Sequence, residues 1–335
     1  MPTCTHSIHF ECRLCHASGT YPVFKAREMM YGTLESFDYV HCSSCGCLQI
    51  CEIPDDLGLY YPADYYSQLA SDEPAEATGL KGAVTRWFCR SSALRPASSL
   101  EAMLRSTLPV PTDFSMFGQY LVEARLQSQF DRILDVGCGS SPYRLAAFRR
   151  CGFIAVEGID PFNSADAEYH GVPVYQRTIE QMEGVYGLIM FHHSLEHVPD
   201  PVTALRAAAR LLCTGGTCLV RIPVMGTHFW RTFGVDWIEL DAPRHLHLMA
   251  PRTVEVLAQA TGFRLRKTEF DSQGWEIAGS RQYQANIPWR DARSVAQTGA
   301  NTMFNAEDLR DFETQANELN RAADGGRACF YLEKL

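Results

Sequence analysis

The sequence lacks long apolar runs and an excess of positive charge. No stretch approaches the roughly 18 apolar residues of a membrane-spanning helix, and residues 1–10 lack the basic and then apolar order of an export signal. Lys and Arg number 30 against 39 Asp and Glu, a formal charge of −9, so composition disfavours binding to nucleic-acid phosphates. We expect a soluble, cytoplasmic protein without a membrane span, and 335 residues suffice for one large domain and a smaller module.

Cysteine, by contrast, is plentiful. Seven of the 13 cysteines fall between Cys4 and Cys51, and without an export signal such crowding indicates free thiols or metal ligands rather than disulfides. Two Cys-x-x-Cys pairs stand out, with residues 16–41 between them. Four thiolates can close a tetrahedral zinc site, which contributes on the order of 10 kcal/mol to folding a small module. The expected zinc ligands are Cys12, Cys15, Cys42 and Cys45.

The residues between the two pairs suit a β-hairpin, because segments such as Phe37–His41 alternate in polarity. This favours a zinc ribbon over the alternative of unlinked buried thiols. Only Arg13, Lys25 and Arg27 are basic in the region. We therefore expect a structural or substrate-covering role for the ribbon.

A short apolar run, Arg132–Val136, breaks into Gly137, Cys138 and Gly139. This pattern is typical of a buried parallel strand that enters a tight turn before a helix. Glycine permits positive φ angles and a close approach to a ligand at the strand's carboxyl end, where open α/β sheets bind ligands. Asp135 adds a carboxylate beside this turn.

A second apolar run, 153–159, ends at Asp160 and Pro161, about 20 residues further on. An acid at that place can hold a ribose diol. The third glycine of a dinucleotide-binding fingerprint is missing, because Pro142 stands in its position. The missing glycine disfavours a nicotinamide dehydrogenase.

The order Leu134–Gly139 followed by Gly158–Asp160 resembles that of class I S-adenosylmethionine-dependent methyltransferases. The resemblance implies S-adenosylmethionine as cofactor and Asp160 as the ligand of its ribose. It also implies a contact near the adenine after the third strand, where Glu180 stands, although Glu180 can equally start a helix. The cofactor-binding set that we expect is Asp135, Gly137, Cys138, Gly139, Asp160, Pro161, Glu180 and His192.

Strand and helix patterns alternate from Arg132 onward, which predicts a parallel sheet with helices on both faces. A helix over 113–130 is expected to precede the sheet. The fold class is therefore α/β, Rossmann-like, with a seven-stranded, mostly parallel sheet and a small N-terminal zinc ribbon. By resemblance the last strand is antiparallel. The expected strands are 132–136, 155–159, 174–175, 188–191, 217–222, 264–270 and 328–332, with a helical insertion over about 282–326, helical around 306–323.

Two histidines, His192 and His193, end the strand 188–191. They belong to a run, 188–201, that resembles the segment after the fourth strand in many small-molecule methyltransferases. Either imidazole could be a general base, because its pKa lies near neutrality and is easily tuned. Alternatively, one ring lines the cofactor pocket and the other is buried. We expect structural roles for Glu196 and His197, which follow.

The segment 223–252 is the expected substrate lid, because it is dense in aromatic and titratable residues. It resembles the segment of deoxysugar C-methyltransferases in which a Glu-His pair supplies the base. His245 matches that histidine and is our first candidate base, whereas Arg244 replaces the glutamate. The replacement makes methylation of a hydroxyl at least as well supported as methylation of carbon. His245 can alternatively only form a hydrogen bond across the lid.

Residues 10–66 resemble the N-terminal segment of zinc-containing bacterial methyltransferases of sugar, polysaccharide and natural-product pathways. In those enzymes the aromatic-rich stretch matching residues 60–66 helps to form the substrate side of the cleft. The expected organisation is a zinc module over 1–66, a linker with a helical connector over 67–112, and a methyltransferase domain over 113–335.

These expectations combine into methyl transfer to a small-molecule acceptor, such as a nucleotide-linked sugar whose phosphates pair with Arg244 or Arg231. Two rivals remain. One is an RNA methyltransferase that reads nucleic acid with its ribbon, and the other is a module that binds S-adenosylmethionine without catalysis. The oligomeric state is open.

Overall fold

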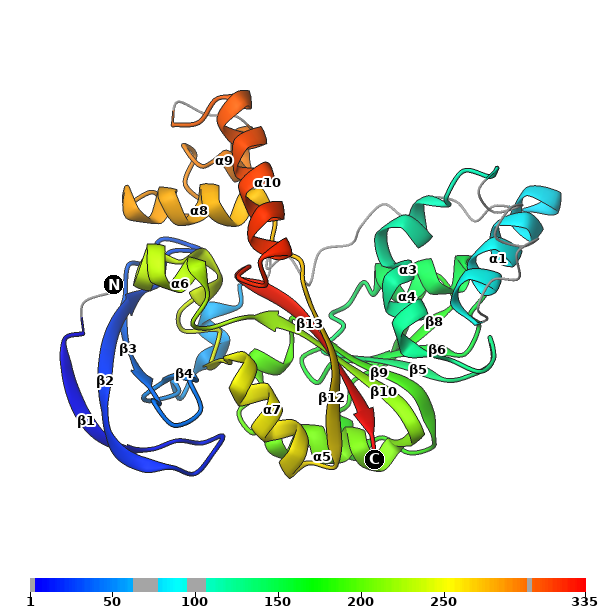
Figure 1. Cartoon of the computed structure of the whole chain (residues 1–335), viewed down its shortest axis with the longest axis horizontal. Coiled ribbons are helices and arrows are strands. Elements are labelled where there is room, and N and C mark those ends of the chain that lie inside the picture. Colours follow the sequence, from blue (N-terminus) through cyan, green and yellow to red (C-terminus); the bar gives the residue numbers. More distant parts are fainter. Residues whose placement is uncertain (1–3, 63–77, 95–106, 300–302) are drawn as a thin grey trace.

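The computed structural model describes residues 4–62, 78–94, 107–299 and 303–335. Two β-sheets organise these residues, one of eight strands and one of five (Figure 1). Within the described ranges, none of the helices combines the length and the hydropathy of a membrane span. Residues 63–77 and 95–106, which hold part of the expected aromatic segment and half of the expected linker, lie outside the described residues.

The larger sheet has five adjacent parallel strands at its centre, so their carboxyl ends lie along one edge. The strand β13 runs antiparallel to both of its neighbours, as the resemblance implies. Across the sheet the order is β12 (Phe263–Phe270), β13 (Arg327–Lys334), β10 (Leu212–Pro223), β9 (Tyr186–His192), β5 (Ile133–Val136), β6 (Val156–Ile159), β8 (Val172–Tyr175) and β7 (Ala167–Tyr169).

The seven expected strands are all present, and the count of seven is corrected to eight by β7. β7 pairs antiparallel with β8 at the edge of the sheet. Its three residues are exposed or half-buried, so they carry no apolar periodicity that a sequence pattern could reveal.

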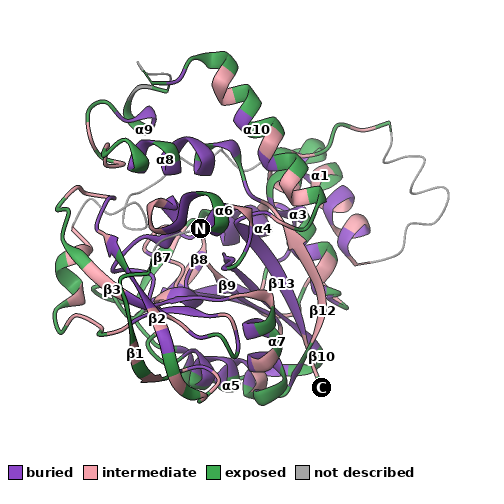
Figure 2. Ribbon diagram, turned by 60° about the vertical axis from the view of Figure 1, so that its left-hand side comes forward, coloured by how far each residue is buried: buried purple, intermediate pink, exposed green. Residues whose placement is uncertain are grey.

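Helices cover both faces of the larger sheet. On β9, Ile189 and Phe191 belong to one hydrophobic cluster with α5 (Pro201–Leu211) and α7 (Pro251–Ala260). The alternate residues Leu188 and Met190 belong to another cluster with α1 (Gly79–Ala93), α3 (Thr112–Ala124) and α4 (Tyr143–Arg150). Because successive strand residues point to opposite faces, both sides of β9 are buried. Figure 2 shows this burial for the central strands.

The smaller sheet is antiparallel and contains the expected hairpin. β2 (Ser18–Arg27) pairs with β3 (Ser36–His41), with Val23 opposite Val40. β1 (His6–Glu11) and β4 (Leu48–Ile50) flank this pair. The fifth strand, β11 (His247–Leu248), comes from the expected lid and pairs with β4. The N-terminal module and the lid segment therefore share one sheet.

The expected lid segment is packed between the N-terminal module and the rest of the chain. It contains α6 (His228–Phe233) and the short helices η5 (Gly234–Asp236) and η6 (Ile238–Leu240). The ring of Trp230 packs edge to face against that of Phe24 in β2, with ring centroids 5.2 Å apart, and Trp237 is fully buried. Burying such aromatic side chains stabilises the packing of the module by about 1.5–3 kcal/mol each.

Three helices fill most of the region between β12 and β13 (Figure 1): α8 (Gly274–Gln284), α9 (Val295–Thr298) and α10 (Ala306–Arg321). The helix expected around 306–323 is thus present. The helical region begins at Gly274, earlier than the expected 282. Gly274 lies against α10, since a Cβ there would approach the Glu313 nitrogen to 2.5 Å. Only glycine allows the two helices to approach so closely.

Candidate active site

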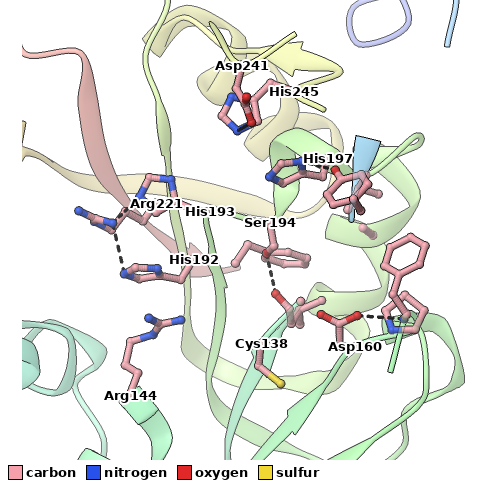
Figure 3. Close-up of a pocket in the computed structure, with 18 of the residues that line it drawn as sticks. Cys138, Arg144, Asp160, His192, His193, Ser194, His197, Arg221, Asp241 and His245 are labelled. Carbon is pink, nitrogen blue, oxygen red and sulfur yellow. Dashed lines mark hydrogen bonds and ion pairs between the residues drawn. The ribbon is translucent and has the colours of Figure 1, made fainter. Parts of the chain in front are cut away.

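A cleft of about 1680 Å³ opens at the carboxyl edge of the larger sheet (Figure 3). Its walls come from segments far apart in the chain: Tyr61 follows the small sheet, Gly137 and Asp160 follow β5 and β6, and His245 belongs to the lid segment. This is the edge at which the sequence places its candidate ligands.

Gly137 shapes the base of the cleft. Its φ is +72°, a conformation that glycine adopts without steric cost. A Cβ at this position would come within 2.6 Å of the Ser194 Cβ. The Ser194 hydroxyl in turn donates to the Val136 carbonyl at 2.6 Å. The glycine therefore lets the turn after β5 pack against the turn after β9.

Asp160 lies at the end of β6 and lines the cleft beside Cys138 and Pro161. One carboxylate oxygen accepts from the Gly139 N–H at 3.0 Å and the other from the Phe162 N–H at 2.9 Å. These bonds fix the carboxylate at the cleft wall, and burial raises its pKa. Gly139 donates to Asp160 but is not itself among the residues that line the cleft.

Asp135 is fully buried and does not line the cleft. It accepts a hydrogen bond from Arg144 Nη2 at 2.9 Å, and Arg144 does line the cleft. Burial raises the pKa of Asp135, and the guanidinium opposes that shift. The Asp135 carboxylate therefore faces Arg144 instead of the cleft, and no local sequence pattern marks this arginine.

Glu180 lines the rim of the cleft from the short helix η3 (Ile179–Gln181) and is exposed. Its position after β8 agrees with the expected adenine side. Its place in the first turn of η3 also agrees with the alternative that it starts a helix.

His192 and His193 both line the cleft beside Arg221 (Figure 3). His192 Nε2 lies 3.4 Å from Arg221 Nη1 and 3.4 Å from the Tyr120 hydroxyl. His193 Nε2 also contacts Arg221 Nη1. Burial lowers the pKa of both rings, and the guanidinium lowers it further. A neighbouring fixed positive charge makes both imidazoles poor proton acceptors.

His245 lies in the opposite wall of the cleft and is held on two sides. The Tyr39 hydroxyl donates to the His245 carbonyl at 2.9 Å, and His245 Nδ1 lies 2.7 Å from the Glu239 carbonyl. Because a carbonyl only accepts, Nδ1 carries the proton and Nε2 offers its lone pair. Nε2 lies 4.0 Å from Asp241 Oδ2. Burial lowers the pKa of His245, and Asp241 opposes that shift.

His197 also lines the cleft, although sequence analysis gave it only a structural role. Its ring centroid lies 4.6 Å from that of His245. Its Nδ1 lies 2.9 Å from the Arg244 carbonyl and 2.9 Å from the Tyr61 hydroxyl. Burial lowers the pKa of His197 to about 3. No sequence pattern marks His197 as a residue of the cleft. His245 lies in a distant segment of the chain, and only the fold brings the two rings together.

The two arginines expected to pair with phosphates are not available in the cleft. Arg244 is fully buried, and it donates to Asp241 at 2.5 Å and to Glu28 at 2.7 Å. Arg231 pairs with Asp324 and does not line the cleft. Arg244 instead ties the lid segment to the N-terminal module.

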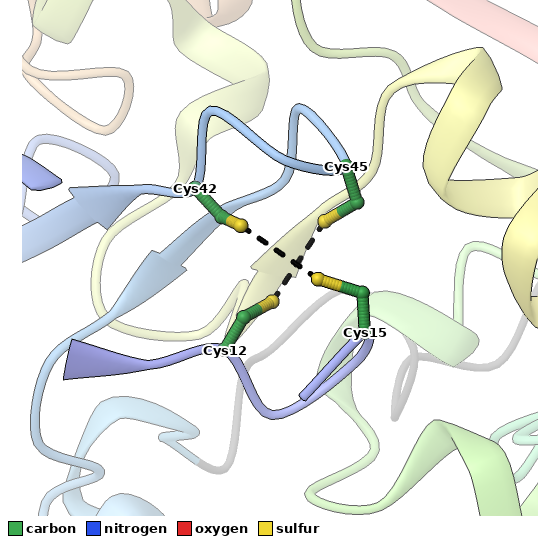
Figure 4. A group of neighbouring side chains, drawn as sticks. All are labelled: Cys12, Cys15, Cys42 and Cys45. Carbon is green, nitrogen blue, oxygen red and sulfur yellow. Dashed lines mark hydrogen bonds between the residues drawn. The ribbon is translucent and has the colours of Figure 1, made fainter. Parts of the chain in front are cut away.

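The four cysteines expected to bind zinc lie together (Figure 4). The sulfurs of Cys12 and Cys45 are 3.7 Å apart, and so are those of Cys15 and Cys42. A regular tetrahedron with zinc–sulfur bonds of 2.3 Å has edges of about 3.8 Å. The sulfur spacing therefore fits a tetrahedral zinc site.

Comparison with known proteins adds to this geometry. Residues 113–268 match the model of a family described as a methyltransferase domain. The protein is an S-adenosylmethionine-dependent methyltransferase. Its cofactor is accordingly S-adenosylmethionine, and the turn after β5 and Asp160 lie inside the matched range.

This methyltransferase is similar to ubiquinone biosynthesis O-methyltransferases of several bacteria. Identity to that of Pseudomonas aeruginosa (strain LESB58) is 26% over 195 residues, covering 53% of this chain and 76% of the relative. Identity to that of Xanthomonas oryzae pv. oryzae (strain PXO99A) is 29% over 176 residues, covering 48% and 67%.

Among solved structures, a mycolic acid cyclopropane synthase complexed with SAH and CTAB matches with a TM-score of 0.43 and 19% identity. That match covers 78% of this chain and 100% of the other. A putative sarcosine dimethylglycine methyltransferase from Galdieria sulphuraria matches with a TM-score of 0.41 and 15% identity, covering 70% and 87%.

Proposed function

We propose that this methyltransferase methylates a hydroxyl oxygen of a small-molecule acceptor. The observation that carries the proposal is the orientation of His245, whose Nδ1 donates to the Glu239 carbonyl while Nε2 is left as a proton acceptor in the cleft wall. S-adenosylmethionine supplies a methyl group that its sulfonium already activates. The protein must mainly align the acceptor hydroxyl and receive its proton.

The donor half of the cleft fits the cofactor. The positive φ of Gly137 opens the turn after β5, and Cys138 and Pro161 line the wall beside it. Asp160 is fixed by two backbone N–H groups, so its remaining lone pairs can accept from ribose hydroxyls. The Asp135–Arg144 pair supports the same wall, while Glu180 and His192 border it.

The acceptor half of the cleft carries the candidate base. Both His192 and His193 contact the Arg221 guanidinium through Nε2, and the Glu196 carboxylate lies 3.4 Å from Nδ1 of His193. At His245 the nitrogen left as acceptor, Nε2, instead has the Asp241 carboxylate 4.0 Å away. An adjacent carboxylate stabilises an imidazolium, whereas an adjacent guanidinium destabilises it. We propose that His245 is the general base that accepts the proton of the acceptor hydroxyl.

Oxygen is a better supported target than carbon. Arg244 stands in place of the glutamate that accompanies the histidine in deoxysugar C-methyltransferases, and its guanidinium donates to Asp241, Glu28 and the Tyr60 carbonyl. The similar proteins are named O-methyltransferases. Trp275 and Trp289 line the cleft with ring centroids 5.7 Å apart, which suits an acceptor that contains a ring. Ring-bearing natural-product precursors and nucleotide-linked sugars both satisfy this description.

We further propose that Cys12, Cys15, Cys42 and Cys45 hold a structural zinc ion. The spacing of their sulfurs supports it. The zinc would fix the module that supplies Tyr39 to His245, Tyr61 to His197 and Glu28 to Arg244. The role of the ribbon is then to build the acceptor wall.

Transfer of labelled methyl from S-adenosylmethionine tests the proposal. Three acceptor pools are compared: small phenols, nucleotide sugars with glycan precursors, and total RNA. Label on a hydroxyl oxygen of a small molecule is the expected result. Label in RNA, or label on carbon, would contradict the proposal. Binding of the cofactor without label in any pool would favour the non-catalytic module.

A further inference from the structure

Glu196 is a buried carboxylate that the proposed function does not use. It lies in the short helix η4 (Leu195–His197), directly after β9, and its exposed fraction is zero. Among the residues that the structure describes, neither carboxylate oxygen has a hydrogen-bond partner. His193 Nδ1 lies 3.4 Å from Oε1 without hydrogen-bond geometry. Burial of a carboxylate in this state is unfavourable unless a cation or a proton compensates it.

Two histidines beside Glu196 are oriented like metal ligands. His197 Nδ1 lies 2.9 Å from the Arg244 carbonyl, and His245 Nδ1 lies 2.7 Å from the Glu239 carbonyl. Metal-binding histidines commonly donate one ring N–H to a carbonyl, which directs the other nitrogen to the metal. Here the two carbonyls fix both Nδ1 protons and leave both Nε2 lone pairs for a ligand.

The three side chains also converge. One ligand atom from each of Glu196, His197 and His245 lies within 4.8 Å of the others. The carboxylate of Asp241, which approaches His245, is engaged by Arg244 Nε and Nη2 and is not a fourth ligand. Three protein ligands leave coordination positions for a substrate, as in catalytic metal sites.

We propose that Glu196, His197 and His245 bind one divalent first-row transition cation, separate from the four-cysteine cluster. Two imidazoles and one carboxylate suit Mn²⁺, Fe²⁺, Co²⁺ or Zn²⁺ better than the all-oxygen preference of Mg²⁺ or Ca²⁺. Since His197 and His245 line the cleft, the open positions of the cation face the acceptor.

This site deepens the proposed function and rests on it for its chemical role. A bound cation lowers the pKa of a coordinated hydroxyl. The O–H bond breaks and the proton leaves to water. A lone pair of the oxygen then forms the bond to the methyl carbon, and the electron pair of the broken carbon–sulfur bond stays on sulfur. With the cation bound, His245 is a ligand and no longer the base. The favoured acceptor carries two adjacent oxygens that can chelate the metal, as in a vicinal diol.

Manganese binding to the full-length protein that carries one zinc ion per chain, at the four cysteines, tests the site, with free Mn²⁺ followed by electron paramagnetic resonance. We expect one Mn²⁺ per chain in wild type and in His228→Gln, a lid histidine outside the cluster. Glu196→Gln and His245→Gln should bind at least about 100-fold more weakly. Absence of Mn²⁺ binding in wild type, or equal affinity in all four proteins, would overturn the proposal.

Two further measurements keep the test decisive if a variant folds poorly. S-adenosylmethionine affinity reports the integrity of each variant. In wild type, pulsed resonance should show two imidazole nitrogens coupled to the bound Mn²⁺, and absence of that coupling would overturn the site.

Methyl transfer after chelation separates this inference from the proposed function. Loss of transfer that Mn²⁺ restores supports the site and the methylation of a hydroxyl, with His245 as a metal ligand instead of the base. Transfer that persists without metal, in a protein that binds no Mn²⁺, overturns the site and leaves His245 as the base. Coupled Mn²⁺ in a protein that methylates no acceptor overturns the proposed function and leaves the site.

Discussion

The two walls of the cleft are built in different ways. The donor wall, with Gly137, Cys138 and Asp160, comes from two consecutive strands and the turns that follow them. The acceptor wall brings together Tyr61, His197 and His245, which lie far apart in the sequence. It exists because the N-terminal module docks onto the lid segment through β4 and β11. The donor wall therefore depends on local backbone geometry, whereas the acceptor wall depends on tertiary packing.

The largest effect should come from breaking the module. Cys42→Ser removes one thiolate of the proposed zinc site, and a site of this kind contributes on the order of 10 kcal/mol to folding. We expect loss of bound zinc, unfolding of the small sheet and methyl transfer below about 1% of wild type, since Tyr39 and Tyr61 no longer hold the histidines. Zinc content, thermal unfolding and turnover check this. Cys4→Ser, exposed and outside the cluster, is the control; full activity of a zinc-free Cys42→Ser would contradict the account.

Removing the acceptor-wall histidine should have the next largest effect. His245→Gln removes either a general base or a metal ligand, and loss of positioned acid–base chemistry lowers turnover about 10²- to 10⁴-fold. Initial rates with saturating S-adenosylmethionine measure the change. His228→Gln should retain wild-type turnover. A fully active His245→Gln would remove this residue from the mechanism.

Alanine substitutions at two matched glycines, one in the donor wall and one outside it, test the donor wall. Gly137 and Gly215 have φ angles of +72° and +73°, so alanine is strained by a similar amount at both. Only at Gly137 would the new Cβ meet another side chain, Ser194, at 2.6 Å. We expect Gly137→Ala to bind S-adenosylmethionine at least about tenfold more weakly than Gly215→Ala, or about 1.4 kcal/mol. Equal affinities in a calorimetric titration would contradict the role given to this turn.

The smallest effect should follow from loosening the acceptor wall. Tyr39→Phe leaves the buried His245 carbonyl without the donor that now lies 2.9 Å away. An unsatisfied buried polar group costs about 1–3 kcal/mol, and we expect the free energy of unfolding to fall by that amount. Turnover should fall a few-fold. Tyr60→Phe removes an exposed hydrogen bond to Glu35 and should cost at most about 0.5 kcal/mol. Denaturant titrations distinguish the two, and equal costs would show that Tyr39 does not support the wall.

The same difference explains how much the sequence could predict. The seven strands and the turn at Gly137 follow from local patterns, since periodicity and backbone constraints act over a few residues. β7 is too short and exposed to leave a pattern. The role of Arg144 could not be predicted from the sequence either, because its contact with Asp135 depends on how α4 packs.

The acceptor wall could be predicted only in part. His245 is identified through a resemblance, but its Nδ1 partner is a carbonyl that only the fold brings near. Glu196 and His197 read as structural residues after a strand, because His245 lies in a distant segment. The sequence suggests Arg244 as a phosphate ligand. In the structure, however, Arg244 forms ion pairs with Glu28 of the N-terminal module and with Asp241. Contacts between distant segments leave no local signal in one sequence.

Titration of S-adenosylmethionine into His245→Gln tests most directly whether the two walls are separate. We expect a dissociation constant within about twofold of wild type, because the donor wall consists of the turns after β5 and β6 and contains no part of the lid segment. A loss of affinity of tenfold or more would contradict it, and would show that donor and acceptor are held by one inseparable site.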